Sequence, residues 1–200
     1  MQATTQLSSG LNQNGTQQQQ QRSKGSPHER LTAMGLTPLG RASEYADDIY
    51  ALMAKTPLFS GLDMTETRTL GAFMYVYDAP AGITLINEGD TGDFMTLLMS
   101  GMVDVLRRNR YNYPSRIAVA HAGHALGEMS MFDGEPRFAS CVTLEQCRLA
   151  VLTRDSLMLV LQDEARLGNK ILLKLVQLLS DRLRQTSSKL VSYLETARDS

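Results

Sequence analysis

The chain reads Gly127-Glu128-Met129-Ser130-Met131-Phe132-Asp133-Gly134-Glu135-Pro136-Arg137-Phe138-Ala139-Ser140 between two strand-like segments. A glycine-led turn into a short helix presents backbone N–H groups without helical partners, and such a concavity favours an anion. Arg137 adds a permanent positive charge whose planar fork suits a phosphate. Glu128 is an acceptor without a donor, which suits a ribose hydroxyl. Residues 127–140, called the cassette below, therefore predict a site for a sugar fused to a phosphate.

The residues on both sides of the cassette alternate with the two-residue period of strands. Between residues 74 and 153 the alternation is visible at Met95, Leu97 and Met99. Glycines interrupt it at short, regular intervals: Gly82, Gly89, Gly92, Gly101, Gly123, Gly127 and Gly134. This pattern predicts an antiparallel barrel or sandwich with its own core, in a mainly β protein with added helices. Gly89 and Gly92 look like turn positions that need unusual dihedral angles, and Gly101 looks like a hairpin glycine.

Helical periodicity flanks the predicted barrel on both sides. Residues 43–55 predict a short amphipathic helix, and the pair Asp63 and Glu66 resembles a capping box that opens a second helix towards Phe73. After residue 153 a short helix is expected to about residue 161. A long helix then follows from Asp163 towards the end of the chain.

The long helix carries an apolar seam with alternating steps of four and three residues. Its members are Leu172, Val176, Leu179, Leu183, Thr186, Leu190, Tyr193 and Ala197. Such a heptad pattern favours a parallel homodimer through a coiled coil. The alternative is that the stripe packs on its own barrel.

Residues 1–41 are predicted to form a disordered arm rich in Gln and Ser. They contain no aromatic side chain and include a glutamine run at 17–21, so they offer little apolar surface to offset the entropy of ordering. A Gln-rich interaction segment is the alternative. The expected organisation is thus an arm at 1–41, a barrel with flanking helices at 42–162, and a coiled-coil helix at 163–200.

Bulk composition gives no sign of membrane or nucleic-acid binding. Twenty basic and twenty-one acidic residues leave a formal charge of −1, and no apolar run reaches the length of a bilayer span. We therefore expect a cytoplasmic protein.

Cys141 and Cys147 lack a metal-ligand spacing and are expected to be small buried hydrophobes. His121 and His124 have no nucleophile at a recognisable spacing, so we expect neither an enzyme, a metal nor a cofactor.

The order of these motifs resembles the cyclic nucleotide-binding domain family over residues 51–194. The resemblance includes the segments 56–62 and 86–93, the strand end Ser100-Gly101, and the cassette. It implies a β-barrel of the double-stranded β-helix or jelly-roll kind, with N-terminal helices and a long C-terminal dimerisation helix.

What the resemblance implies for the ligand is most specific in the cassette and the last helix. Glu128 is expected to receive the ribose 2′-hydroxyl, Arg137 the cyclic phosphate, and backbone amides near Ser130 and Phe138 are expected to assist.

The residues 182–189 resemble the helix with which the bacterial catabolite activator branch of the CRP/FNR superfamily contacts adenine. The implied ligand-binding set is Gly127, Glu128, Met129, Ser130, Arg137, Phe138, Arg182, Thr186 and Ser187. Cyclic AMP is the expected ligand, and Thr186 is a polar residue in an apolar seam that gains from such a partner. The alternative for Thr186 is that it only tunes helix register.

Two departures from that branch shape the remaining expectations. Phe138 stands where the branch carries a hydroxyl, which weakens a cyclic GMP interpretation. No helix-turn-helix follows residue 200, so we expect no direct reading of DNA and an unidentified protein partner instead. The competing hypotheses are a cyclic di-GMP receptor, a ligand-free scaffold with a vestigial pocket and, least favoured, an enzyme.

Overall fold

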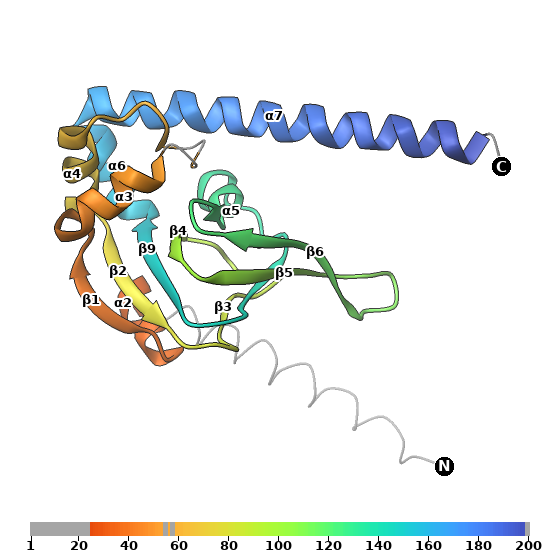
Figure 1. Cartoon of the computed structure of the whole chain (residues 1–200), viewed down its shortest axis with the longest axis horizontal. Helices are drawn as coiled ribbons and strands as arrows, with labels where there is room; N and C mark the ends of the chain where they lie inside the picture. The colour runs from red at the N-terminus through yellow and green to blue at the C-terminus, as the bar shows by residue number, and fades with distance from the viewer. Residues whose placement is uncertain (1–24, 54–55, 57–58, 199–200) are drawn as a thin grey trace, which may run out of the picture.

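Two antiparallel sheets form the body of the protein, as the computed structural model in Figure 1 shows. The structure describes residues 25–53, 56 and 59–198. The first sheet has the order β1-β2-β9-β4-β7, from β1 (Thr37–Arg41), β2 (Tyr75–Ala79), β9 (Cys147–Thr153), β4 (Phe94–Ser100) and β7 (Ala125–Leu126). The second has the order β3-β8-β5-β6, from β3 (Thr84–Ile86), β8 (Ser140–Thr143), β5 (Met102–Arg108) and β6 (Pro114–His121). The predicted class, a mainly β barrel with helices, is confirmed.

The core has two parts because successive side chains of a strand point to opposite faces. Met95, Leu97 and Met99 of β4 face the helices and join the cluster between the first sheet and the helical layer. Phe94 and Leu98 face the other way and join the cluster between the two sheets. Strand β4 is therefore buried on both faces.

The helices pack against the outer face of the first sheet. They are η1 (Ala42–Tyr45), α3 (Ala46–Met53), α4 (Met64–Ala72), α6 (Arg154–Asp163) and the start of α7 (Ala165–Arg198). The predicted capping box at the start of α4 is confirmed, since Asp63 Oδ1 accepts from the Glu66 amide (2.8 Å) and Glu66 Oε2 accepts from the Asp63 amide (3.0 Å). The helical layer thus follows the predicted order of elements.

The N-terminal segment departs from its prediction. Residues 1–24 lie outside the described part, but 25–41 are folded as helix α2 (Pro27–Ala33) and strand β1, so the expected arm boundary at 41 is wrong. Leu31 is 1% exposed, and His28 Nδ1 lies 2.7 Å from the hydroxyl of Tyr77. Arg30 Nη2 donates to both carboxylate oxygens of Asp93 at 2.5 Å. These contacts with distant residues offset the entropy lost when the segment becomes ordered. Local composition does not reveal such contacts.

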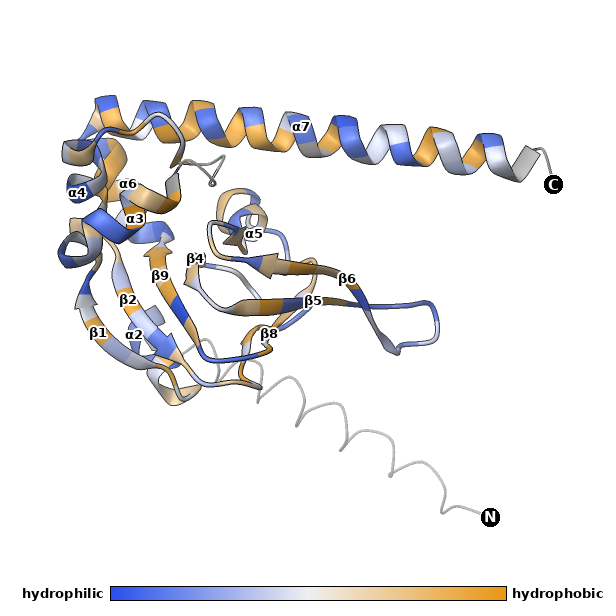
Figure 2. Cartoon of the chain, viewed as in Figure 1, coloured by the Kyte–Doolittle hydropathy of each residue, from blue (hydrophilic) through white to orange (hydrophobic). Residues whose placement is uncertain are grey.

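Helix α7 has an anchored half and a projecting half. Leu167, Ile171 and Leu175 are buried against the helical layer, whereas every residue from 183 to 196 is exposed. Figure 2 shows apolar residues continuing along the projecting half. Leu183 and Tyr193 of the predicted seam are 68% and 74% exposed, so the alternative that the seam packs on its own barrel is wrong there. Within the described residues, neither α7 nor any other helix combines the length and apolar content of a membrane span.

Both cysteines are buried free thiols, as predicted. Cys141 is 4% exposed and Cys147 is 1% exposed. Burial raises the pKa of the Cys141 thiol to about 12. Both thiols therefore stay protonated at neutral pH and pack as small hydrophobic groups.

Candidate functional site

The cassette forms a short helix between two glycines. Helix α5 spans Glu128–Asp133, and Gly127 before it (φ 78°) and Gly134 after it (φ 76°) both adopt the left-handed conformation. Met131 is 1% exposed and belongs to the helix-side core cluster. The glycines define where the helix begins and ends, and Met131 fixes it to the body.

The Arg137 side chain is buried beneath this helix, with only 4% of the residue exposed. Its Nη1 donates to the carbonyl of Gly127 (2.6 Å), and its Nη2 donates to the carbonyl of Phe94 (2.7 Å). The guanidinium carbon also lies 4.7 Å from the centre of the Phe94 ring. A guanidinium has five N–H donors, and these two bonds engage one on each terminal nitrogen. The fork is thus held at the start of α5.

Main-chain bonds fix Arg137 to the loop that precedes β4. The amide of Arg137 donates to the carbonyl of Asp90 (2.8 Å), and the amide of Gly89 donates to the carbonyl of Arg137 (2.9 Å). The 87–93 loop and the cassette are therefore one hydrogen-bonded unit, although residues 94–126 separate them in sequence.

The electrostatic setting of Arg137 is that of a charge removed from water. Burial lowers the pKa of the Arg137 guanidinium, and the nearby acidic groups Asp93, Cys141, Glu128 and Asp90 oppose that shift. Charge interactions are stronger in such a medium than at the surface. An anion that reached this guanidinium would therefore gain more than it would from an exposed arginine.

Two glycines make room for the guanidinium. A Cβ atom at Gly127 would lie 2.4 Å from Nη1 of Arg137, and one at Gly92 would lie 2.7 Å from its Cζ and 2.6 Å from Cβ of Ser130. The expectation that Gly92 needs an unusual dihedral is wrong, because its φ is not among the positive values, whereas Gly89 (φ 86°) and Gly101 (φ 91°) do have positive φ. Gly92 is required for close approach instead.

The other cassette residues divide between buried and exposed positions. Glu128 and Ser130 are each 3% exposed, and Glu128 contributes to the charge environment of Arg137. Met129 and Phe138 are 41% and 49% exposed. The Arg107 guanidinium carbon of β5 lies 3.7 Å above the Phe138 ring, which is a cation–π contact at the rim of the cassette. The structure therefore brings Gly127, Glu128, Ser130 and Arg137 together in the interior.

The expected base-contacting residues belong to the last helix. Thr186 and Ser187 are exposed on the projecting half of α7, and the side chain of Arg182 lies outside the described residues. Thr186 is part of the same exposed face as Leu183 and Leu190. Their contact with a ligand therefore stays a prediction.

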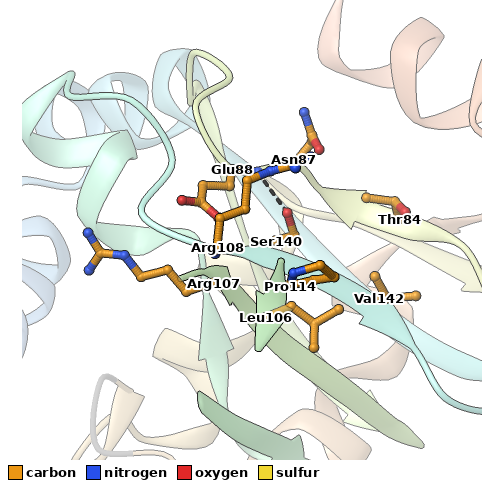
Figure 3. Close-up of a pocket in the computed structure, with 9 residues that line it drawn as sticks. All are labelled: Thr84, Asn87, Glu88, Leu106, Arg107, Arg108, Pro114, Ser140 and Val142. Carbon is orange, nitrogen blue, oxygen red and sulfur yellow. Dashed lines mark hydrogen bonds between the residues drawn. The ribbon is translucent and has the colours of Figure 1, made fainter. Parts of the chain in front are cut away.

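A hollow of about 150 Å³, shown in Figure 3, borders the end of the cassette at Ser140 and the start of the 87–93 loop. The amide of Glu88 donates to Ser140 Oγ (2.9 Å) at its edge, and the Arg108 amide donates to Glu88 Oε2 (2.8 Å). Its lining comprises Thr84, Asn87, Glu88, Leu106, Arg107, Arg108, Pro114, Ser140 and Val142. Since ligand pockets usually enclose about 300 Å³ or more, and neither Glu128 nor Arg137 lines this hollow, we do not assign the nucleotide to it.

Sequence reasoning missed three contributors to the site. Phe94 supplies a carbonyl and a ring to Arg137, Gly92 supplies space, and Arg154 donates from α6 to the carbonyls of Ser130 and Met131. The partners of Phe94 and Arg154 are main-chain groups or atoms distant in sequence, so no local pattern marks these two residues, and Gly92 was recognised only as a turn glycine. The only available signal was the 87–93 loop motif, which ends beside Phe94.

Comparison with known proteins agrees with this geometry. A profile described as "Cyclic nucleotide-binding domain" matches residues 78–164. A cyclic nucleotide-binding domain from Methylobacillus flagellatus is 39% identical in sequence, with a TM-score of 0.70, covering 78% of this chain and 88% of that one. The catabolite activator protein of Thermus thermophilus is 28% identical, with a TM-score of 0.62, covering 68% and 62%.

A curated relative extends the comparison to transcription regulators. The CRP-like cAMP-activated global transcriptional regulator of Mycobacterium tuberculosis strain H37Rv is 27% identical over 145 residues, which are 72% of this chain and 63% of the relative. The chain thus spans less than two thirds of the length of that regulator and of the Thermus protein. With the two-sheet fold, the buried Arg137 and Glu128, and a relative that matches along most of both chains, this protein belongs to the cyclic nucleotide-binding domain family.

Proposed function

We propose that this protein is a cytoplasmic receptor for cyclic AMP that binds its ligand without turnover. Arg137 binds the cyclic phosphate, and Glu128 accepts a hydrogen bond from the ribose 2′-hydroxyl. The observation that supports this most directly is that the buried Arg137 guanidinium donates to the carbonyl of Gly127, whose neighbour Glu128 is also buried and acts on the charge of Arg137. A cyclic nucleotide presents one anionic group and one hydroxyl donor at adjacent positions, which matches a cation beside an acceptor.

Helix α7 completes the proposed receptor as a parallel homodimer. Helix α7 exposes Val176, Leu183, Leu190 and Tyr193 at heptad spacing, and such a row is stable in water when a second helix covers it. In the dimer, Thr186 and Ser187 would close over the base, and Arg182 would line the same pocket. Ligand binding would then favour the helix arrangement that lets both sets of residues meet, and a protein partner would recognise that arrangement.

We predict that Leu183→Asp disrupts the dimer. A carboxylate at a seam position would be buried without a partner, which should weaken association at least a hundredfold. Sedimentation equilibrium should show the wild-type protein as a dimer and this variant as a monomer at the same concentration. Gln185→Asp adds the same charge off the seam and should remain dimeric; a wild-type protein that sediments as a monomer at tens of micromolar would contradict the dimer.

We predict that cyclic AMP raises the melting temperature of the purified protein. A ligand that binds only the folded state stabilises it by about 2.7 kcal/mol at a hundred times its Kd. The measurement is a thermal-shift panel with cyclic AMP, cyclic GMP and cyclic di-GMP at matched concentrations, and 5′-AMP serves as the control. A shift with cyclic di-GMP alone would favour a receptor for that ligand, and no shift with any of them would favour a ligand-free scaffold.

A further inference from the structure

Arg154, the first residue of α6, reaches back to the far end of the cassette helix. Its Nε donates to the carbonyl of Met131 (2.8 Å), and its Nη2 donates to the carbonyls of Ser130 (2.9 Å) and Gly92 (3.4 Å). Its own amide donates to the carbonyl of Asp93 (2.7 Å). One half-buried arginine thus joins α6 to α5 and to the loop before β4.

These bonds satisfy groups that a short helix leaves without partners. The last four carbonyls of an α-helix have no intrahelical donor, and a cation near them is also favoured by the helix dipole. At the end of α5, the amide of Gly134 donates to the carbonyl of Ser130 (3.1 Å). The Arg154 guanidinium donates to the same carbonyl and to that of Met131. Arg154 therefore holds the C-terminal end of α5, while Gly127 and Arg137 hold its N-terminal end.

Arg154 and Arg137 bind the main-chain carbonyls of three consecutive residues, Gly92 and Asp93 of the loop and Phe94 at the start of β4. Arg154 contacts the carbonyls of Gly92 and Asp93, and Arg137 contacts the carbonyl of Phe94. Any shift of Arg137 towards a ligand would therefore act on main-chain atoms adjacent to those that Arg154 holds. The two arginines share one loop, which gives a short physical path between the cassette and α6.

Helices α6 and α7 pack closely at their junction. A Cβ atom at Gly168 of α7 would lie 2.7 Å from Cδ2 and 3.1 Å from Cα of Leu161 in α6. Leu157 and Val160 of α6 also share a core cluster with Leu167 of α7. A displacement at the start of α6 would therefore act directly on the anchored half of α7.

We propose that Arg154 is a positioning residue that aligns the cassette helix and couples it to α7. This inference rests on the proposed function for its ligand-dependent part, because it assigns the cassette as the nucleotide site. Its ligand-free part stands on the hydrogen bonds alone: without the Arg154 fork, α5 loosens and the start of α7 loosens with it.

The test is hydrogen exchange, followed by mass spectrometry, on the full chain with and without cyclic AMP. Arg154→Ala and Arg154→Lys are compared with Arg148→Ala, which removes an arginine on β9 that pairs with Asp78 (2.8 Å) outside the cassette. Without ligand, Arg154→Ala should speed exchange at least tenfold in residues 128–134 and 165–175. Arg154→Lys, which keeps the charge without the fork, should restore part of the protection, and Arg148→Ala should leave both segments unchanged.

The measurements with cyclic AMP distinguish coupling between the cassette and α7 from simple stabilisation of α5 by Arg154. In the wild-type protein, cyclic AMP should change exchange in residues 165–178, whereas Arg154→Ala should still bind cyclic AMP by calorimetry and lose most of that change. Unaltered exchange in 128–134 would overturn the positioning role, and an intact response in α7 would overturn the coupling. If the wild-type protein binds no cyclic AMP, the proposed function fails, and the ligand-free comparison of 128–134 with 165–175 still decides the role of Arg154.

Discussion

Replacing Arg137 with alanine is expected to lower the affinity for cyclic AMP about ten- to a hundredfold, because a hydrogen bond to a charged group contributes about 1.5 to 3 kcal/mol net. The variant should also be less stable. The carbonyl of Gly127 loses its Nη1 donor and the buried carbonyl of Phe94 loses its Nη2 donor, and a buried acceptor left unsatisfied costs about 1 to 3 kcal/mol. Calorimetric titration measures the affinity, and thermal unfolding measures the loss of stability.

The control for this prediction removes an arginine of similar size from a different place. Arg148 pairs with Asp78 and its side chain is 38% exposed, so Arg148→Ala should change stability little and leave the affinity as it is. Titrations well below the melting temperature of each variant separate loss of binding from loss of folding. If the Arg137→Ala protein is folded and binds cyclic AMP with wild-type affinity, the cassette is not the nucleotide-binding site.

Replacing Gly127 with alanine is expected to lower the affinity at least tenfold. The new Cβ would lie 2.4 Å from Nη1 of Arg137 and 2.8 Å from Cδ1 of Ile86, so the guanidinium must leave its present position. Alanine at a positive φ also destabilises the fold by about 1 to 2 kcal/mol. Calorimetry with cyclic AMP and denaturant unfolding measure the two effects separately.

Gly82 provides a matched control for the backbone part of this effect. Its φ of 79° is nearly that of Gly127, but an added Cβ would meet nothing within 4 Å. Gly82→Ala should therefore lose stability through strain alone and keep its affinity. Equal affinities for the two alanine variants would show that the close contact with Arg137 does not matter for binding.

Much of the fold was predictable because local patterns agree with the tertiary structure. One such pattern is the capping pair Asp63 and Glu66, which forms at the start of α4. Another is the two-residue alternation of β4, whose side chains are buried in the two core clusters. The folded N-terminal segment was missed, although Ser26 and Glu29 form a capping box around Pro27 that could have marked α2. That helix depends on tertiary contacts such as Leu31 in the core, and polar composition hides them.

The cassette was predictable for the opposite reason: its residues are adjacent in sequence. Glu128 and Arg137 share one segment, so a single motif identified both. Arg154 and Phe94 act on the site through main-chain carbonyls or from far along the chain, and any residue presents such a carbonyl. A sequence pattern describes side chains, so contacts to the backbone leave no trace in it.

The projecting half of α7 also makes the helix a lever. Thirty-four residues at 1.5 Å each give a length of about 50 Å, with the fulcrum at Leu167, Ile171 and Leu175. The arm beyond Leu175 extends about 35 Å to Arg198, so a tilt of about 5° at the fulcrum would swing the free end by about 3 Å. A sub-ångström adjustment near the barrel would thereby become a movement large enough for another macromolecule to sense at the tip.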